Sequence, residues 1–218
     1  MSLEYYQHVR SEIAPLLPVK AERILEIGCG AGATLGWLRG RYPGAHLAGV
    51  EGFASNEPHI AKVADQAIIA DLNSGVPNVG QFDLILALDV LEHLLDADRI
   101  LAQLASMLAP GGAIIVSLPN IAHYSVSASL LLKRQFAYAD EGILDRTHLR
   151  FFEESSILAL MNKAGLSITQ GLAAGLNGPK SRLLDTATLG LFRHWLTKQY
   201  IVRGEHGAGQ QPVKWRVA

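Results

Sequence analysis

Short apolar runs alternate with amphipathic stretches along most of this chain. The runs at 23–27, 82–88 and 113–118 are mostly apolar, and each is followed by a turn that contains glycine, aspartate or proline. A run of this kind is typical of a strand buried on both faces of a sheet, and its alternation with helical stretches is typical of βα units. The sequence therefore predicts an α/β fold built around a parallel sheet.

The same pattern gives an element map. We expect strands at 23–27, 46–51, 67–70, 82–88, 113–118, 166–172 and 199–203. We expect helices at 3–16, 33–42, 55–65, 97–108, 153–164 and 180–196. In this interpretation residues 1–203 form a single domain, 120–150 form a weakly structured insertion on the substrate side, and 204–218 form a polar tail.

The composition excludes several classes of protein. Apolar residues make up 49% of the 218 residues and the formal net charge is -1, so we expect a globular protein without a broad nucleic-acid surface. Cys29 is the single cysteine and cannot form an internal disulfide. We see neither a signal sequence nor an apolar run long enough for a membrane span, and we therefore expect a cytoplasmic protein. The oligomeric state stays open.

A glycine-rich turn follows the first expected strand. Gly28, Gly30 and Gly32 stand where a strand gives way to a helix, and glycines there let backbone N–H groups approach a ligand. We expect a side chain at Gly28 or Gly30 to fill the ligand's place while leaving the sheet folded. The turn alone has other interpretations. With Ala33 and Glu51 it also fits a dinucleotide site, and it can simply pack a helix on a strand.

Acidic residues at three successive strand ends separate these interpretations. Glu26 lies beside the turn, where a carboxylate would repel a pyrophosphate but would suit a positively charged ligand. Glu51 ends the second strand, where it can accept hydrogen bonds from both hydroxyls of a ribose. Asp71 follows the third strand and can accept from an adenine amino group, while Leu72 covers the ring. The pattern favours an adenosine ligand that carries a cationic group in place of phosphate.

Taken together, several segments resemble the class I S-adenosylmethionine-dependent methyltransferase family over about residues 20–203. They are ILEIGCGAG, the acid at Glu51, the Ala-Asp-Leu at 70–72, FDLILALDVLEHL and LAPGG. The resemblance implies a Rossmann-like, seven-stranded, mostly parallel sheet with helices on both faces and an antiparallel last strand. It also implies S-adenosylmethionine as cofactor and S-adenosylhomocysteine as product.

The resemblance assigns the cofactor site residue by residue. The cofactor-binding residues that it implies are Glu26, Gly28, Gly30, Gly32, Glu51, Asp71, Leu72, Leu88 and Asp89. Leu88 and Asp89 would flank the methionine part of the cofactor. Tyr5 and Tyr6 resemble aromatic residues of an N-terminal helix that lie over the ligand, and Tyr6 is a candidate substrate contact; simple helix packing explains both equally well.

A second, more specific resemblance lies after the fifth strand. Pro119-Asn120, His123, Phe136 and GILDRTHLRFF at 142–152 resemble a bacterial subgroup associated with cell-surface glycan biosynthesis. We therefore expect methyl transfer to the oxygen of a small molecule or a glycan. Two other hypotheses stay open: a non-catalytic protein that binds the cofactor, and an NAD(P)-dependent oxidoreductase.

Histidines are the candidate bases for a hydroxyl acceptor, because neutral imidazole accepts a proton near physiological pH. The candidates are His93, His123 and His148, and each can equally well serve a structural role. Asn120, His123 and Arg150 are candidate acceptor contacts. On an extended run His148 and Arg150 would face the same cleft, since side chains alternate with a period of two.

We expect no metal ion. Asp89, Asp96 and Asn120 are conceivable oxygen ligands, but nothing in the sequence brings them together.

Overall fold

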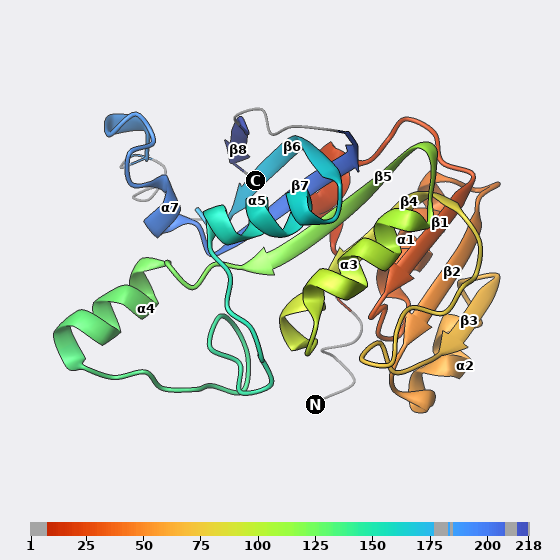
Figure 1. Cartoon of the computed structure of the whole chain (residues 1–218), viewed down its shortest axis with the longest axis horizontal. Coiled ribbons are helices and arrows are strands. Elements are labelled where there is room, and N and C mark those ends of the chain that lie inside the picture. Colours follow the sequence, from red (N-terminus) through yellow and green to blue (C-terminus); the bar gives the residue numbers. More distant parts are fainter. Residues whose placement is uncertain (1–7, 177–182, 184, 208–212, 218) are drawn as a thin grey trace.

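An eight-stranded sheet runs through the centre of the computed structural model, which describes residues 8–176, 183, 185–207 and 213–217. The strands follow the order β3-β2-β1-β4-β5-β7-β6-β8 (Figure 1). Their bounds are Arg23–Ile27 for β1, His46–Glu51 for β2, Gln66–Ile69 for β3, Phe82–Leu88 for β4, Leu108–Pro119 for β5, Leu166–Ala174 for β6, Gln199–His206 for β7 and Trp215–Val217 for β8.

The predicted fold class is confirmed, with one more strand than the seven expected. Strands β1 to β5 pair in parallel, β7 is antiparallel to both β5 and β6, and β8 is parallel to β6. The additional strand lies inside 204–218, which we expected to be a polar tail. Strand β7 also continues into this segment as far as His206. Strand β8 pairs through only three residues, and the Trp215 ring packs on Tyr200 with centroids 4.6 Å apart. So short a strand leaves no apolar run for a sequence pattern to detect.

Helices connect the strands. The α-helices are α1 Ala33–Arg41, α2 Glu57–Ile60, α3 Ala97–Ser106, α4 Tyr124–Ala128, α5 Glu154–Lys163 and α7 Arg193–Leu196. The 3-10 turns are η2 Ser11–Leu16, η3 Ala54–Asn56 and η4 Leu91–His93, and the π turn η5 is Ser129–Lys133.

Three of the predicted helices are shorter than expected. Of the helix predicted at 3–16, residues 3–7 lie outside the described part of the chain, and residues 11–16 form the 3-10 turn η2. This turn contains Pro15, and a proline lacks the N–H that a helix interior needs. The helix predicted at 55–65 is divided between η3 and α2. The helix predicted at 180–196 includes α7, and residues 177–182 lie outside the described part of the chain.

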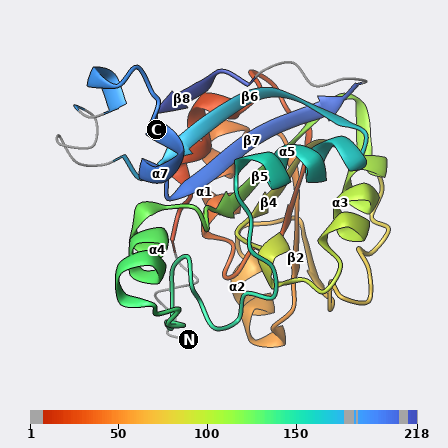
Figure 2. The same ribbon diagram turned by 60° about the vertical axis from the view of Figure 1, so that its left-hand side comes forward.

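Two hydrophobic cores lie on the two faces of the sheet. One contains Ile100, Leu104 and Leu160 from α3 and α5, and the other contains Leu35 and Leu38 from α1. Strand residues alternate between the two cores, as the period of two requires. Figure 2 shows α3 and α5 on one side of the sheet and α1 on the other. The sheet is thus buried on both faces, which explains its unbroken apolar runs.

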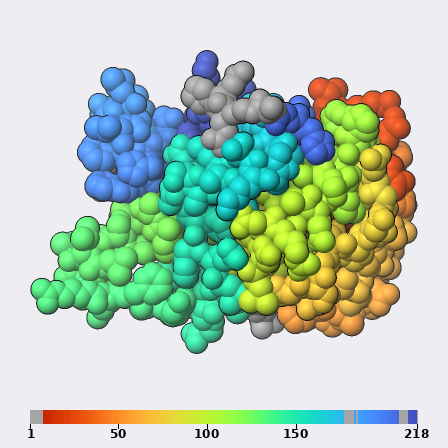
Figure 3. Space-filling view, viewed as in Figure 1, coloured from red at the N-terminus to blue at the C-terminus, as the bar shows by residue number. Residues whose placement is uncertain are grey.

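The topology defines one functional edge. The carboxyl ends of the parallel strands β1 to β5 meet there, and the start of the antiparallel β7 joins them. The strand order reverses between β1 and β4, and ligands of open α/β sheets bind at such a point. The segment 120–150 leaves the end of β5 and projects from the body of the molecule (Figures 1 and 3). In the described part of the chain we find no helix with the length and apolarity that a membrane span requires.

Candidate active site

The glycine turn after β1 adopts a backbone that other residues rarely adopt. Gly28, Gly30 and Gly32 have φ values of 60°, 54° and 80°. A Cβ built on Gly28 would lie 2.4 Å from Cγ2 of Val90. Our expectation that a side chain at Gly28 would only fill the ligand's place is therefore wrong: it would also collide with the loop after β4. Glycine is needed here for packing as well as for ligand access.

Glu51 connects the end of β2 to this turn. Its carboxylate is buried and accepts hydrogen bonds from the N–H of Gly30 at 3.0 Å and from the N–H of Phe53 at 3.1 Å. A carboxylate has about four acceptor positions, so two N–H donors leave capacity for a ligand. The structure thus places Glu51 against the glycine turn, where the sequence predicted a ribose contact.

Glu26 is the most unusual carboxyl of the turn. It is only 4% exposed, and its Oε2 has no hydrogen-bond partner in the described part of the chain. Burial raises the pKa of Glu26 to about 8, although the nearby Arg10 and a hydrogen bond from Thr34 oppose the shift. A buried oxygen without a partner is costly, and a ligand that donates to it would remove this cost.

Asp71 and Leu72 follow the end of β3. Asp71 is exposed, and its Oδ1 accepts from the N–H of Asn73 at 2.9 Å. Leu72 is buried in the core beside α3. The carboxylate of Asp71 is thus accessible at the strand end where the sequence predicted an adenine contact.

Arg10 is a residue of this site that sequence analysis missed. Its Nη1 lies 2.6 Å from Oδ2 of Asp89, the residue that follows β4, and its Nη2 donates to Ser117 of β5 at 3.3 Å. Asp89 has a φ of 56°, uncommon for a residue other than glycine, and also accepts hydrogen bonds from Ser117 and Gln199. No sequence signal marked Arg10, because it stands in a stretch that we interpreted as an ordinary helix.

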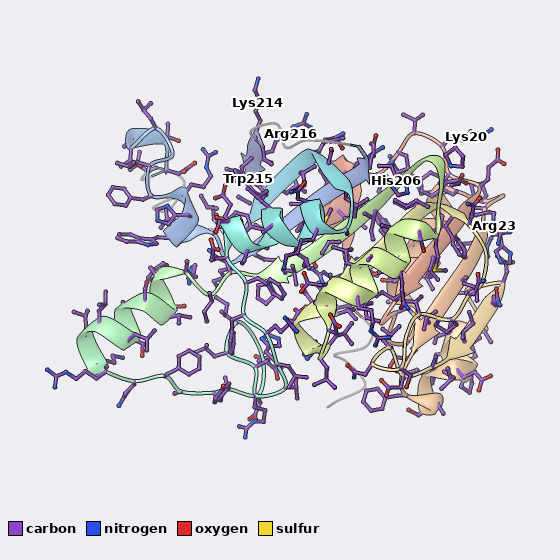
Figure 4. The ribbon with its side chains drawn as sticks, in the orientation of Figure 1. Lys20, Arg23, His206, Lys214, Trp215 and Arg216 are labelled. Carbon is purple, nitrogen blue, oxygen red and sulfur yellow. The ribbon has the colours of Figure 1, made fainter. Side chains whose placement is uncertain are left out.

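This network joins the ends of β4, β5 and β7 at the functional edge. Leu88, the last residue of β4, is buried beside it. Tyr5 and Tyr6, expected over the ligand, lie outside the described residues. The basic side chains labelled in Figure 4, among them Lys20, Arg23 and His206, lie away from the segment 120–150. Arg10 brings a positive charge into the network through its hydrogen bond to Asp89.

A second group of polar residues lies around η4. The carbonyl of Glu92 accepts the N–H groups of Leu149 at 2.8 Å and Arg150 at 3.1 Å, which fastens the segment after residue 145 to η4. The rings of His93 and His148 come together, with centroids 4.7 Å apart at an interplanar angle of 70°. The structure thus joins two of the three histidines that the sequence proposed as bases.

Burial gives His148 and Glu92 unusual acid–base properties. Burial, and then the nearby His93, lower the pKa of His148, which is therefore neutral at neutral pH. Burial, and then the nearby Asp89, raise the pKa of Glu92 well above its ordinary range. Glu92 was not proposed from the sequence, although the adjacent acid and histidine in Leu-Glu-His-Leu were visible there.

His123 and Asn120 serve the fold. The Nδ1 of His123 accepts from the N–H of Ser125 at 3.2 Å and caps α4, and burial lowers the pKa of His123 to about 4. Asn120 is fully buried: its amide donates to the carbonyls of His194 and Thr197, at 2.7 and 2.8 Å. The prediction that Asn120 contacts the acceptor is therefore wrong, because its amide hydrogens are used inside the protein.

Arg150 does not share the partners of His148. Its guanidinium donates to the carbonyl of Leu95 at 2.5 and 3.1 Å, whereas the Nδ1 of His148 donates to the carbonyl of Ile143 at 3.1 Å. Our expectation that the two side chains face one cleft does not match this geometry. Arg150 fastens the loop to Leu95. The chain bends at Leu149, between His148 and Arg150, so residues 148–150 do not form the straight extended run that would have aligned the two side chains.

Aromatic rings stand beside the histidine pair. Phe136, Tyr138 and Phe151 form a cluster with centroid separations of 5.4 to 6.5 Å, and Phe151 lies 6.3 Å from the ring of His148. Phe136 and Tyr138 are 41% and 53% exposed, so this aromatic wall is open to a ligand.

Comparison with known proteins identifies the family. The sequence model of the methyltransferase-domain family matches residues 3–170, more than half of the chain, and the chain therefore belongs to this family. A solved S-adenosylmethionine-dependent methyltransferase from Clostridium acetobutylicum has a TM-score of 0.62 at 13% identity, and the alignment covers 95% of this chain and 93% of the other. By family this is a methyltransferase domain, and its fold is that of S-adenosylmethionine-dependent methyltransferases.

Curated relatives match part of the chain. The ubiquinone biosynthesis O-methyltransferase of Azorhizobium caulinodans is 34% identical over 120 residues, which are 52% of this chain and 47% of that protein. The trans-aconitate 2-methyltransferase of Methylobacterium nodulans is 35% identical over 103 residues, 45% of this chain and 38% of that protein. The chain thus matches less than half the length of these relatives.

Proposed function

We propose that this protein transfers the methyl group of S-adenosylmethionine to an oxygen atom of a small-molecule acceptor. One observation carries the proposal: the ends of three neighbouring parallel strands present Glu26, Glu51 and Asp71 around a glycine turn. The unpartnered buried oxygen of Glu26 fits the cofactor's ammonium group, a donor that neither NAD nor a nucleotide phosphate would offer at this place.

We assign the remaining cofactor contacts from the places of the residues at the strand ends. Glu51 would accept from the ribose hydroxyls and Asp71 from the adenine amino group, beside the apolar Leu72. Arg10 would pair with the carboxylate of the methionine part, because it stands at the end of β4 where that part would lie. Asp89 orients the Arg10 guanidinium.

The chemistry divides between cofactor and protein. The cofactor supplies a methyl group on a positively charged sulfur, and the sulfur keeps the bonding electron pair when the methyl group leaves. The protein must align the acceptor oxygen and accept its proton. His148 and His93 stand beside the aromatic wall and are the best-placed groups for that proton.

The relatives support an oxygen acceptor. The Azorhizobium relative is named an O-methyltransferase, and the exposed aromatic wall suits a planar acceptor that stacks on it. The alternative is a glycan acceptor, which the resemblance of the segment 142–152 suggests. The assay described next includes sugars and therefore distinguishes the two acceptor classes.

The test is methyl transfer from isotopically labelled S-adenosylmethionine to a panel of phenols, hydroxy acids and sugars, read by mass spectrometry. The proposal predicts a methyl ether on one acceptor class and formation of S-adenosylhomocysteine. Transfer to nitrogen alone, or cofactor binding without any turnover across the panel, would contradict it.

A further inference from the structure

A carboxylate and two imidazoles converge beside η4. One ligand atom from each of Glu92, His93 and His148 lies within 4.8 Å of the ligand atoms of the other two. Glu92 and His148 are 1% and 8% exposed, and His93 is partly exposed. The group is therefore enclosed on one side and open on the other.

Both imidazoles are held with the same nitrogen turned to the protein. The Nδ1 of His148 lies 3.1 Å from the carbonyl of Ile143, and the Nδ1 of His93 lies 3.3 Å from the carbonyl of Thr147. A carbonyl can only accept. The hydroxyl of Thr147 also lies 3.1 Å from the Nδ1 of His93, but it donates its own hydrogen to Asp145 at 2.6 Å, so each Nδ1 carries the hydrogen. Each Nε2 is then left with its lone pair, and that of His148 lies 4.0 Å from Oε1 of Glu92.

The third ligand lacks a partner. The Oε2 of Glu92 is buried and makes no hydrogen bond in the described part of the chain. Asp89 and Asp145 lie near enough to oppose ionisation of Glu92 further, in addition to its burial. Once Glu92 is ionised, its unpartnered oxygen and the two imidazole lone pairs are all acceptors. A ligand that satisfies all three at once must be a donor or a cation.

We propose that Glu92, His93 and His148 bind a divalent metal ion of the zinc class. Nitrogen ligands favour zinc, cobalt and similar ions over magnesium and calcium, which prefer oxygen. Hydrogen bonds from Nδ1 to backbone carbonyls are the usual support of metal-binding histidines. Metal–nitrogen bonds of about 2.1 Å set ligand atoms roughly 3.4 Å apart, so the side chains must close by about 1 Å on binding.

This proposal departs from our expectation of no metal ion. The residues weighed from the sequence play other roles: Asp96 caps α3, and Asn120 is enclosed by backbone carbonyls. The inference rests on the proposed function for its purpose. With a metal ion bound, both imidazoles would be ligands and could not accept the proton of the acceptor, and the metal ion would instead help the acceptor oxygen to lose it. Three protein ligands leave a coordination position open, and the partly exposed side of the cluster would offer it to an acceptor oxygen beside the aromatic wall.

The test measures metal binding alone, without cofactor or acceptor. Untagged protein, stripped with a chelator, is titrated with Co²⁺ and followed by visible absorption, and with Zn²⁺ and Mg²⁺ by calorimetry. The variants are Glu92→Gln, which keeps the shape of the side chain, and His93→Gln, which changes a partly exposed ring. The matched control is His46→Gln, a histidine 4.0 Å from Asp65 at the start of β2.

The proposal predicts one Co²⁺ or Zn²⁺ per chain and much weaker binding of Mg²⁺. Glu92→Gln and His93→Gln should each lose at least about tenfold in affinity, while His46→Gln should not change it. Wild-type affinity in both cluster variants, or binding that the control weakens equally, would overturn the metal site. Cofactor binding, measured separately, would be untouched by that outcome, so failure here is distinguishable from failure of the proposed function.

Discussion

The two halves of the proposed active site, a cofactor half and an acceptor half, are built differently. The cofactor half consists of strand ends that the sheet register holds side by side. Glu26, Glu51 and Asp71 stand at the ends of β1, β2 and β3, which are adjacent strands of the sheet. The acceptor half joins η4 to a loop more than fifty residues later through backbone hydrogen bonds to Glu92. The first half follows from topology, and the second depends on how one irregular segment folds back.

This difference explains what the sequence predicted. The sheet, its parallel pairing and the position of acidic residues at its strand ends were predictable, because the apolar runs mark the strands and the acids stand at or next to the ends of those runs. Arg10 and Glu92 were missed because their roles depend on contacts distant in the sequence, with Asp89 and with the segment 145–150. Asn120 was misassigned because a sequence does not distinguish a polar residue that contacts a ligand from one that donates to buried backbone carbonyls.

The largest effect that we predict is a loss of folding stability when the glycine turn of the cofactor half is changed. Gly28→Ala should destabilise the protein by roughly 2–4 kcal/mol, since its Cβ would collide with Val90 in a left-handed backbone. Gly40→Ala in α1 is the control: nothing lies within 4 Å of its Cβ, and it should be neutral or stabilising. Thermal melts give the comparison, and an equal melting temperature for Gly28→Ala and wild type would refute the packing role.

The second prediction concerns turnover, which should depend on the acceptor half while cofactor affinity does not. His148→Gln and His93→Gln should each lower turnover by about 100-fold, the scale of a lost catalytic group, whether the ring accepts the proton itself or holds the proposed metal ion. Cofactor affinity should stay within a few-fold of wild type. His46→Gln serves as control. Steady-state rates must be read beside melting temperatures. If activity falls only in proportion to the folded fraction, the histidine pair merely fastens the loop.

A subtler prediction follows from Glu26. Burial raises the pKa of Glu26 to about 8 from its ordinary 4.5, so the stability that its protonated form contributes is complete below about pH 4.5 and is lost as the pH rises through about 8. An ammonium group bound there favours the carboxylate. Cofactor binding at pH 7 should therefore release a fraction of a proton.

Calorimetry in buffers of different ionisation enthalpy measures this release. Wild type should give buffer-dependent enthalpies, and Glu26→Gln should give nearly buffer-independent ones. The same buffer dependence in both proteins would assign the proton to another group.

The most direct test of the account is calorimetric titration of S-adenosylhomocysteine into wild type, Glu51→Ala and His148→Gln, with NAD as the competing ligand. We predict one S-adenosylhomocysteine per wild-type chain and no binding of NAD. Glu51→Ala should weaken binding by roughly 1.5–3 kcal/mol, the scale of charge-assisted hydrogen bonds, and His148→Gln should bind as wild type does. Absence of binding to the folded wild type would contradict the proposed cofactor site. An equal loss of affinity in both variants would contradict the claim that the cofactor half binds its ligand independently of the acceptor half.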